Sequence, residues 1–315
     1  MIRLLLCFLI VIALAVTLSV ELAPAQQQPA VSLAGVIDMH CHVGPDAAQI
    51  RPFSEFDLVR MAKRAGMRGV VIKSHYLPTY DRAQVVMQEM GNDVQVFGGI
   101  VLNRSNGGLN AEAVIKMLQT EGHRGKIVWL PTFDSEAQVK FNKDQRPFVP
   151  IVKDGKPVPE LAEIFRLIAQ NDLVLATGHS GADESLIVVP AARQAGVKKI
   201  LITHAMSDPV RATDEQMKQF ADMGAIMECV WLNALTPQAG TTRRLITAAD
   251  YARAMKLIGP EHFVIASDLG QQMNPVHPDG MIAFVRGLLA EGMTQEQIDR
   301  MSKTNPARLL GLEAW

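Results

Sequence analysis

Residues 36–46 read VIDMHCHVGPD, an apolar run that ends in two histidines one residue apart and then in a Gly-Pro turn. Side chains of a β-strand alternate between its two faces, so an extended segment here places His40 and His42 on one face and Met39 and Cys41 on the other. Two imidazoles on one face are candidate metal ligands. A His-x-His pair alone is more often structural, so the rest of the chain decides its meaning.

The short apolar run at this stretch is the first of a series that alternates with amphipathic, helix-like segments to the C-terminus. The expected strands are Val36–Asp38, Gly69–Lys73, Val94–Leu102, Lys126–Leu130, Leu173–Thr177, Lys199–Thr203, Ala225–Cys229 and His262–Ser267. The expected helices include Phe56–Ala65, Ala111–Gln119, Pro159–Asn171, Ser185–Ala195, Asp214–Met223 and Thr247–Ile258. Strands that alternate with helices in this way indicate a parallel α/β architecture. Eight such pairs predict a single-domain (β/α)8 barrel of the TIM type.

The first residues of the chain differ from the rest. Arg3 precedes an apolar run from Leu4 to about Val20, and Ala23-Pro24-Ala25 has the small-residue pattern of a cleavage site. We therefore expect a signal peptide at 1–25, a linker at 26–33 and the barrel at 34–315, exported to a periplasmic or secreted location. An uncleaved membrane anchor remains the alternative, because the apolar run is marginally long enough to span a bilayer.

Charge and cysteine content narrow the class of protein. The 315 residues carry a formal net charge of -1 with the lysines and arginines scattered, which argues against nucleic acid or an anionic membrane surface as partner. Two cysteines outside the leader, Cys41 and Cys229, are too few to staple a domain of this size, and we expect Cys41 to be a packing residue. A small-molecule substrate is the expected partner, and a homo-oligomer is left open.

Polar side chains able to bind a metal recur where the expected strands end. They are Lys73 and His75 after the second strand, His179 after the fifth, His204 after the sixth and Asp268 after the eighth. The carboxyl ends of barrel strands meet at one mouth, where active sites are built, so these residues are expected to be neighbours of His40 and His42. Imidazole and carboxylate ligands suit zinc first, with manganese, iron or nickel also possible. The three remaining histidines, His123, His262 and His277, are interpreted as structural or loop residues.

A long connection, Pro131–Val158, follows the fourth expected strand. It contains the turn pair Asp154-Gly155, which predicts a small hairpin, and its place on the catalytic face favours a lid over the site. Cations in the loops after strands two and four could bind a substrate carboxylate. They are Arg82, Lys140, Lys143 and Arg146, of which Arg146 is our substrate-binding candidate.

The motifs DMHCHVGPD, TGHS, THA, SDLG and the terminal NPARLLGL, in this order, resemble the amidohydrolase superfamily of metal-dependent barrel hydrolases. The resemblance covers essentially all of the mature chain. It implies that His40 and His42 bind one metal together with Asp268. It also implies that His179 and His204 bind a second metal, or position the substrate if only one metal is present.

The sequence departs from that family after the fourth strand, where binuclear members commonly carry a bridging carboxylated lysine or glutamate. Trp129 and Leu130 stand there instead. Lys73, at the end of the second strand, offers a replacement, because burial next to cations favours the neutral amine, which can react with carbon dioxide to form an anionic carbamate. The alternative is that Lys73 remains an ammonium group that binds an anionic part of the substrate.

The expected function is hydrolysis of an amide, cyclic amide, lactone or ester, because a divalent metal lowers the pKa of bound water towards neutrality. Asp268 would be the catalytic base, and the second histidine pair would polarise the carbonyl. His75 and Glu228 are substrate-binding candidates, and Glu228 could instead hold a metal-ligating histidine. Two alternatives stay open: a metal-dependent decarboxylase or hydratase of the same superfamily, and a non-catalytic metal-holding protein of the cell envelope.

Overall fold

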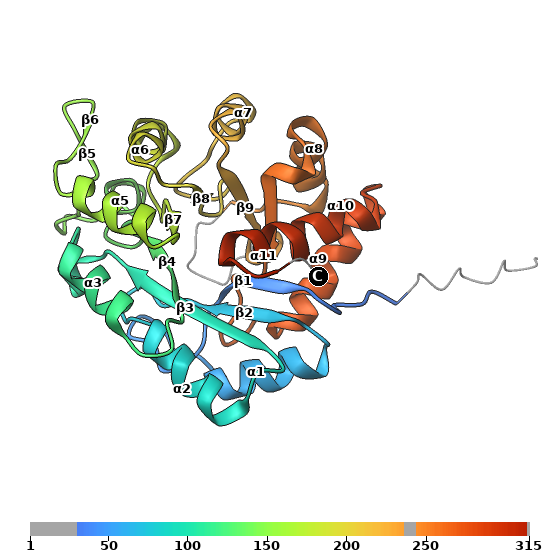
Figure 1. Ribbon diagram of the computed structural model, residues 1–315. Helices are drawn as coiled ribbons and strands as arrows, with labels where there is room; N and C mark the ends of the chain where they lie inside the picture. Colours follow the sequence, from blue (N-terminus) through green and yellow to red (C-terminus); the bar gives the residue numbers. More distant parts are fainter. Residues whose placement is uncertain (1–29, 236–243, 314–315) are drawn as a thin grey trace, which may run out of the picture. The chain divides into compact units, whose positions relative to one another are not determined.

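Eight parallel β-strands form the centre of the computed structural model, which describes residues 30–235 and 244–313. The strands are β1 (Ile37–Cys41), β2 (Gly69–Ile72), β3 (Gln95–Val101), β4 (Gly125–Trp129), β7 (Val174–Ala176), β8 (Lys199–Ile202), β9 (Ile226–Val230) and β10 (Phe263–Ala266), paired in that order (Figure 1). Each of the eight expected strands is present. A separate antiparallel hairpin consists of β5 (Val152–Lys153) and β6 (Lys156–Pro157), with its turn at Asp154 and Gly155 as expected.

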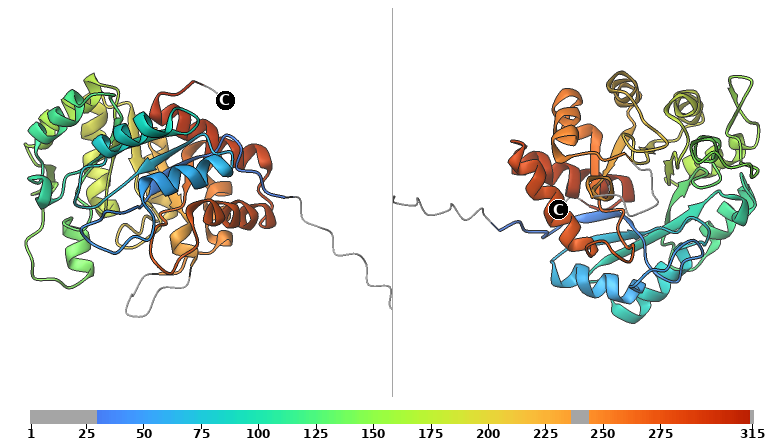
Figure 2. Two further views of the ribbon diagram at one scale, coloured as in Figure 1. Left: turned by 90° about the horizontal axis from the view of Figure 1, so that it is seen from below. Right: turned by 180° about the vertical axis from the view of Figure 1, so that it is seen from behind.

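Helices follow the strands and surround them (Figure 2). They are α1 (Glu55–Arg64), α2 (Tyr80–Met90), α3 (Ala111–Gln119), α4 (Glu136–Phe141), α5 (Leu161–Gln170), α6 (Ala182–Gln194), α7 (Asp214–Asp222), α8 (Ala248–Ile258), α9 (His277–Ala290), α10 (Gln295–Asp299) and α11 (Asn305–Leu310). Capping boxes at Ser54, Thr213 and Thr247 fix the starts of α1, α7 and α8, because each side chain accepts a bond from an otherwise unpaired backbone N–H. All six expected helices form.

The two outermost strands, β1 and β10, meet at a seam that nearly closes the barrel. The backbone N–H of Asp268 donates to the carbonyl of His40 at 2.8 Å, and that of His42 donates to the carbonyl of Leu269 at 2.8 Å. Between them the N–H of Ser267 donates to the Asp38 carboxylate at 2.9 Å. The fold is therefore the expected (β/α)8 barrel, and its closure brings the two histidines of β1 beside Asp268.

The hydrophobic core has two layers. Apolar side chains such as Met39, Val71 and Trp129 fill the barrel interior, and a second cluster lies between the strands and the helices. Leu309 and Leu310 of α11 join the interior cluster, and Arg68, which precedes β2, donates to the carbonyl of Glu313 at 2.9 Å. The C-terminal segment therefore covers the amino ends of the strands, opposite to the end that carries the histidines.

Strand β1 does not alternate as simply as the sequence predicts. Met39 belongs to the interior cluster, whereas Cys41 belongs to the outer one, so the two do not share a face. The reason is a register shift between Asp38 and Cys41 in the pairing of β1 with β2, which inserts a bulge and reverses the alternation. The bulge leaves His40 and His42 directed to the same site, as expected. The prediction that Met39 lies on the opposite face together with Cys41 was wrong.

The expected signal peptide, residues 1–25, lies outside the described residues, as do residues 26–29 of the expected linker. Within the part of the chain that the structure describes, no helix has the length and apolar character needed to cross a bilayer.

Candidate metal centre

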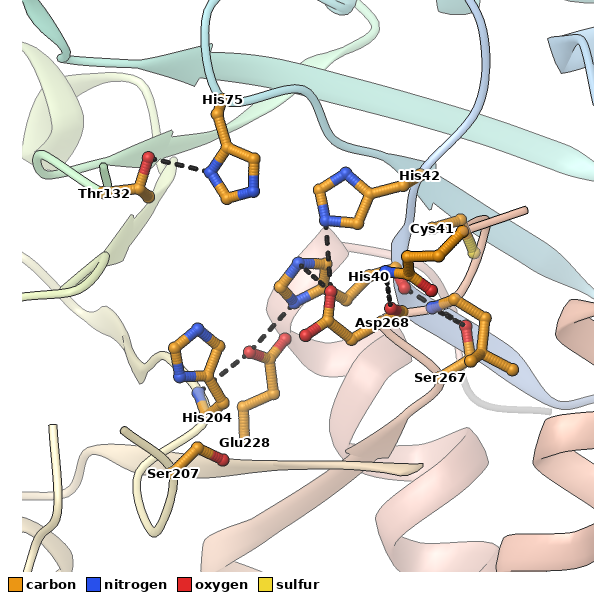
Figure 3. A network of polar contacts seen from close by, with 12 residues as sticks. His40, Cys41, His42, His75, Thr132, His204, Ser207, Glu228, Ser267 and Asp268 are labelled. Atoms are coloured by element: carbon orange, nitrogen blue, oxygen red, sulfur yellow. Dashed lines mark hydrogen bonds and ion pairs between the residues drawn. The ribbon is translucent and has the colours of Figure 1, made fainter. Parts of the chain in front are cut away.

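His40, His42 and Asp268 converge at the carboxyl end of the barrel (Figure 3). One carboxylate oxygen of Asp268, Oδ1, lies 3.2 Å from His40 Nε2 and 3.1 Å from His42 Nε2. All three residues are buried, and their candidate ligand atoms lie within 4.8 Å of one another. They form the one group of at least three histidine, cysteine or acidic side chains with this geometry among residues 30–235 and 244–313.

Glu228 of β9 stands behind His40 and is almost completely buried. Its Oε2 lies 3.2 Å from His40 Nδ1 and accepts the backbone N–H of His204 at 3.0 Å. Burial by itself raises the pKa of Glu228, but His40 and Lys73 outweigh burial and keep the pKa below its ordinary value. An ionised Glu228 therefore favours the His40 tautomer with the proton on Nδ1, which leaves Nε2 free to bind a metal beside Asp268.

The His75 ring stacks on the His42 ring, with centroids 5.0 Å apart, and lies 5.4 Å from the His179 ring. Both His75 and His179 are oriented by a hydrogen bond. His75 Nδ1 lies 3.0 Å from the Thr132 hydroxyl, and His179 Nδ1 lies 2.7 Å from the Gln138 amide oxygen. The His75 ring also stacks on Phe133, with centroids 3.7 Å apart. Burial, followed by nearby cationic groups, holds the pKa of both histidines well below the ordinary value, so both are neutral at pH 7.

His204 and Lys73 complete the polar wall. Burial lowers the pKa of His204 to about 4, and its Nδ1 has no hydrogen-bond partner within the described residues. The His204 ring lies 4.8 Å from the His179 ring, measured between centroids. Lys73 is fully buried, its Nζ also lacks a partner in the described chain, and burial lowers its pKa to about 8.

The backbone is held in unusual conformations at the site. His204 and Asp268 have φ angles of 26° and 53°, a region that residues other than glycine rarely adopt, and such strain is common at functional sites. Gly178, which precedes His179, has φ of 64°, and a Cβ built there would lie 2.2 Å from the carbonyl oxygen of Leu130. A glycine is therefore required for the turn that presents His179.

The cavity between these residues has a volume of about 200 Å³. The structure brings seven expected site residues to its wall: His40, His42, Lys73, His75, His179, His204 and Asp268. Glu228 lies directly behind His40 and is not part of that wall. The volume is below the range of about 300–1,000 Å³ typical of pockets for drug-sized ligands, so the cavity suits a small molecule.

Arg146 is not brought to this cavity. Its guanidinium binds Asp134, Asp144 and the carbonyl of Phe133, so it stabilises the connection after β4 rather than facing the histidines. From the same connection, Phe133 lines the cavity, whereas the β5–β6 hairpin packs against α6. The hairpin was predicted correctly, but its lid role finds no support in this packing.

Several residues of the site were missed by sequence reasoning. Gln49 and Arg51, which follow β1, line the cavity, as does Asn233 after β9. Gln138, which orients His179, lies in the short helix α4 that was not expected. The sequence offered one indication for these residues, their position in segments that follow barrel strands, because such segments form the mouth of the barrel.

The residues present fit a divalent metal. His42 has its pKa held well below the ordinary value, first by burial, so its imidazole is unprotonated and can donate a lone pair at neutral pH. Burial raises the pKa of Asp268, but His40 and His42 outweigh burial and hold it well below the ordinary value, so the carboxylate is ionised. Two imidazoles and one carboxylate match the ligand types of zinc and related divalent ions.

Comparison with known proteins gives one family. Residues 35–228, from two residues before β1 to Glu228 of β9, match the model of a family described as a family of unknown function (DUF6282). The matched range includes His40, His42, Lys73, His75, His179 and His204, and it ends before Asp268. A comparison with curated proteins finds no match.

Solved structures share the fold at low sequence identity. A probable 2-pyrone-4,6-dicarboxylic acid hydrolase from Acinetobacter baumannii has a TM-score of 0.61 and 13% identity, over 88% of this chain and 100% of that one. An amidohydrolase from Pseudomonas aeruginosa has a TM-score of 0.59 and 11% identity, over 87% and 95%. A 2,6-dihydroxybenzoate decarboxylase from Rhizobium has a TM-score of 0.55 and 10% identity, over 88% and 99%. These similarities confirm the (β/α)8 barrel fold.

Proposed function

The chain belongs to the family of unknown function DUF6282, and we propose that it is a metal-dependent hydrolase acting on the carbonyl of an amide, cyclic amide, lactone or ester. The observation that carries the proposal is the convergence of His40, His42 and Asp268 in a small cavity at the carboxyl end of the barrel. Asp268 Oδ1 lies 3.1–3.2 Å from the Nε2 atoms of both histidines. The solved structures that share the fold include hydrolases and a decarboxylase, which supports the proposal that this chain is also an enzyme.

His40, His42 and Asp268 would hold the metal, with zinc as the proposed ion. When bound, the metal would supply a water molecule activated for attack on a carbonyl. Asp268 is ionised and holds its carboxylate at the cavity wall, so it can accept a proton at Oδ1 or Oδ2 and return it to the leaving group. This makes Asp268 both ligand and catalytic base.

His179 and His204 line the same cavity as His42, with their ring centroids 4.8 Å apart. Both are neutral. His179 donates its one N–H, at Nδ1, to the Gln138 amide oxygen, so its Nε2 can offer a lone pair to a second metal. His204 can donate one N–H to a substrate carbonyl oxygen or offer one lone pair to a second metal. His75 is the third neutral imidazole of the wall and remains a candidate for contact with substrate. In this assignment Glu228 orients His40 and does not contact substrate, since its Oε2 already serves His40 and His204.

Two metals bridged by a carboxylated Lys73 extend this proposal. The neutral Nζ would attack carbon dioxide, form an N–C bond and release a proton, which leaves an anionic carbamate. Burial and the absence of a hydrogen-bond partner for Nζ within the described chain support it, although Nζ also lies over the Trp129 ring, 5.7 Å from its centroid. The ligand count supports it as well, because His179 and His204 otherwise need a role with substrate. The bridge would show as a mass increment on Lys73 under native conditions and a metal stoichiometry near two. One metal with an unmodified lysine would reject it.

The test of the function is an activity screen on the metal-loaded protein with amides, lactones, esters and carboxylic acids. A hydrolase incorporates the oxygen of water labelled with ¹⁸O into its product, whereas a decarboxylase releases carbon dioxide from the substrate. His40→Ala should abolish turnover together with metal binding. Stoichiometric metal without turnover on any substrate class would favour a non-catalytic metal-holding protein.

A further inference from the structure

Arg51, between β1 and α1, lines the same cavity and is not used by the proposed hydrolysis. Its side chain is only 1% exposed. Nε and Nη1 are both buried and have no hydrogen-bond partner in the part of the chain that the structure describes. A buried cation with unpaired donors is costly, so such donors are expected to meet a ligand.

Asp46 forms an ion pair with Arg51 but leaves these donors without a hydrogen bond. Its Oδ2 lies 3.5 Å from Arg51 Nε, beyond good hydrogen-bond geometry, and its Oδ1 accepts the backbone N–H groups of Ala48 and Gln49. If a small rotation paired Asp46 with Nε, Nη1 would still need an acceptor. Asp46 therefore orients the guanidinium from one side and leaves another side for a second anion.

The loop that carries Arg51 is fixed in place. Gly44 and Ser54 form a bridge across its base, and Arg82 donates to the carbonyls of Gly44 at 2.8 Å and Pro45 at 3.1 Å. Arg82, expected as a possible carboxylate-binding residue, thus supports the loop instead. A guanidinium presented by an anchored loop loses little conformational entropy when it binds.

The charges around the cavity favour an anionic ligand at Arg51. With Lys73 carboxylated as proposed, Arg51 is the one cation of the described wall, which also holds two acids, Asp208 and Asp268. Asp208 is occupied, because one oxygen pairs with Arg211 and the other accepts the N–H of Arg244 at 2.9 Å. Asp268 serves His40 and His42, so neither acid neutralises Arg51 completely.

We propose that Arg51 binds a carboxylate of the substrate, so that the substrates are small amides, lactones or esters that carry a free carboxylate. The planar guanidinium offers two parallel N–H groups to a carboxylate, which fixes both the position and the orientation of the substrate. The histidine cluster and Arg51 share one cavity of about 200 Å³, so the carboxylate and the scissile carbonyl lie a few bonds apart. This inference rests on the proposed function, because it assigns the substrate class of that site.

Binding to the metal-free protein tests Arg51 apart from catalysis. Dicarboxylates from malonate to adipate are titrated calorimetrically into the wild type, Arg51→Gln, Arg51→Lys and the control Arg60→Gln, whose arginine is exposed on α1 and pairs with Asp57. We expect at least one dicarboxylate to bind, a roughly 10- to 100-fold loss in Arg51→Gln, a smaller loss in Arg51→Lys and none in the control. Glutaramide, the neutral analogue of glutarate, should bind at least tenfold more weakly than glutarate. Equal binding by wild type and Arg51→Gln, or no binding at all, overturns the proposal.

Kinetics with the metal-loaded protein separate this inference from the proposed function. Monomethyl glutarate carries a free carboxylate and dimethyl glutarate does not, and we expect the wild type to prefer the monoester and Arg51→Gln to lose that preference. Equal hydrolysis of both by the wild type contradicts the carboxylate inference and leaves a hydrolase. Tight, Arg51-dependent dicarboxylate binding without hydrolysis of any carbonyl compound leaves Arg51 as an anion site and contradicts the hydrolase. If Arg51→Gln does not fold, Arg51→Lys carries both tests, with melting temperature as the check on folding.

Discussion

Replacing Glu228 by glutamine tests whether the buried acid behind His40 tunes a metal site. The substitution keeps the size of the side chain and removes its charge. The amide oxygen of glutamine can still accept the N–H of His40 and of His204, which Glu228 Oε2 receives at 3.2 and 3.0 Å. What is lost is the negative charge that makes His40 a stronger electron donor.

The expected size of the effect follows from this geometry. Removing a carboxylate that hydrogen-bonds a metal-ligating histidine typically costs 10- to 100-fold in metal affinity. That corresponds to about 1.4–2.8 kcal/mol of binding free energy. Glu228 Oε1 has no hydrogen-bond partner among the described residues, so the new NH2 group breaks no existing bond. The loss should therefore fall on metal affinity more than on folding.

Competition with a chelator of known affinity measures the dissociation constant for zinc in the wild type and in Glu228→Gln. Glu215→Gln, an exposed glutamate on α7, is the matched control and should bind zinc as the wild type does. Thermal unfolding of the metal-free proteins checks that the fold is retained. A zinc affinity within twofold of the wild type for Glu228→Gln would refute the assignment of Glu228 as the partner of a metal-ligating His40.

Three further predictions concern pH, backbone strain and the N-terminus. In metal-free protein the unfolded chain protonates at position 204 near pH 6.5, but buried His204 does so only at about 4, so His204 alone should lower the unfolding free energy by about 3 kcal/mol as pH drops from 6.5 to 4. The lowered pKa values of His42, His75 and His179 add to that fall, and denaturant titrations that give a flat profile would contradict this. Gly178→Ala places a Cβ 2.2 Å from the Leu130 carbonyl oxygen and should destabilise by roughly 1–3 kcal/mol, seen as a lower melting temperature, and an unchanged one would be inconsistent with the turn. Mass spectrometry of exported protein should find an N-terminus near Gln26, whereas an intact leader on cytoplasmic protein would reject the signal peptide.

The strands and the site histidines could be predicted because each depends on local pattern combined with one rule of barrel geometry. An apolar run ending in a polar ligand is visible in sequence, and parallel strands bring such ends together. His40, His42 and Asp268 became neighbours for this reason.

Features that depend on packing between distant segments could not be predicted. The bulge in β1 comes from its pairing with β2, and nothing in residues 36–42 shows it. Arg51 and Arg146 are both arginines in connections that follow barrel strands, so the sequence does not distinguish them. In the structure Arg146 forms an ion pair with Asp134, whereas Arg51 lines the cavity. Helix α9 contains Pro278, Gly280 and Gly287, residues that disfavour a helix, yet a Cβ at Gly280 would lie 2.1 Å from Leu269, so close packing requires the glycine.

Metal content tests the central claim most directly. The purified wild-type chain, loaded in turn with zinc, manganese, iron and nickel, is dialysed and analysed by mass spectrometry for metal per chain, beside His40→Ala and Asp268→Asn. We expect at least one tightly held divalent ion in the wild type and loss of that ion in both variants. Full metal content in His40→Ala, or no stoichiometric metal in a folded wild type, would contradict a metal centre at His40, His42 and Asp268.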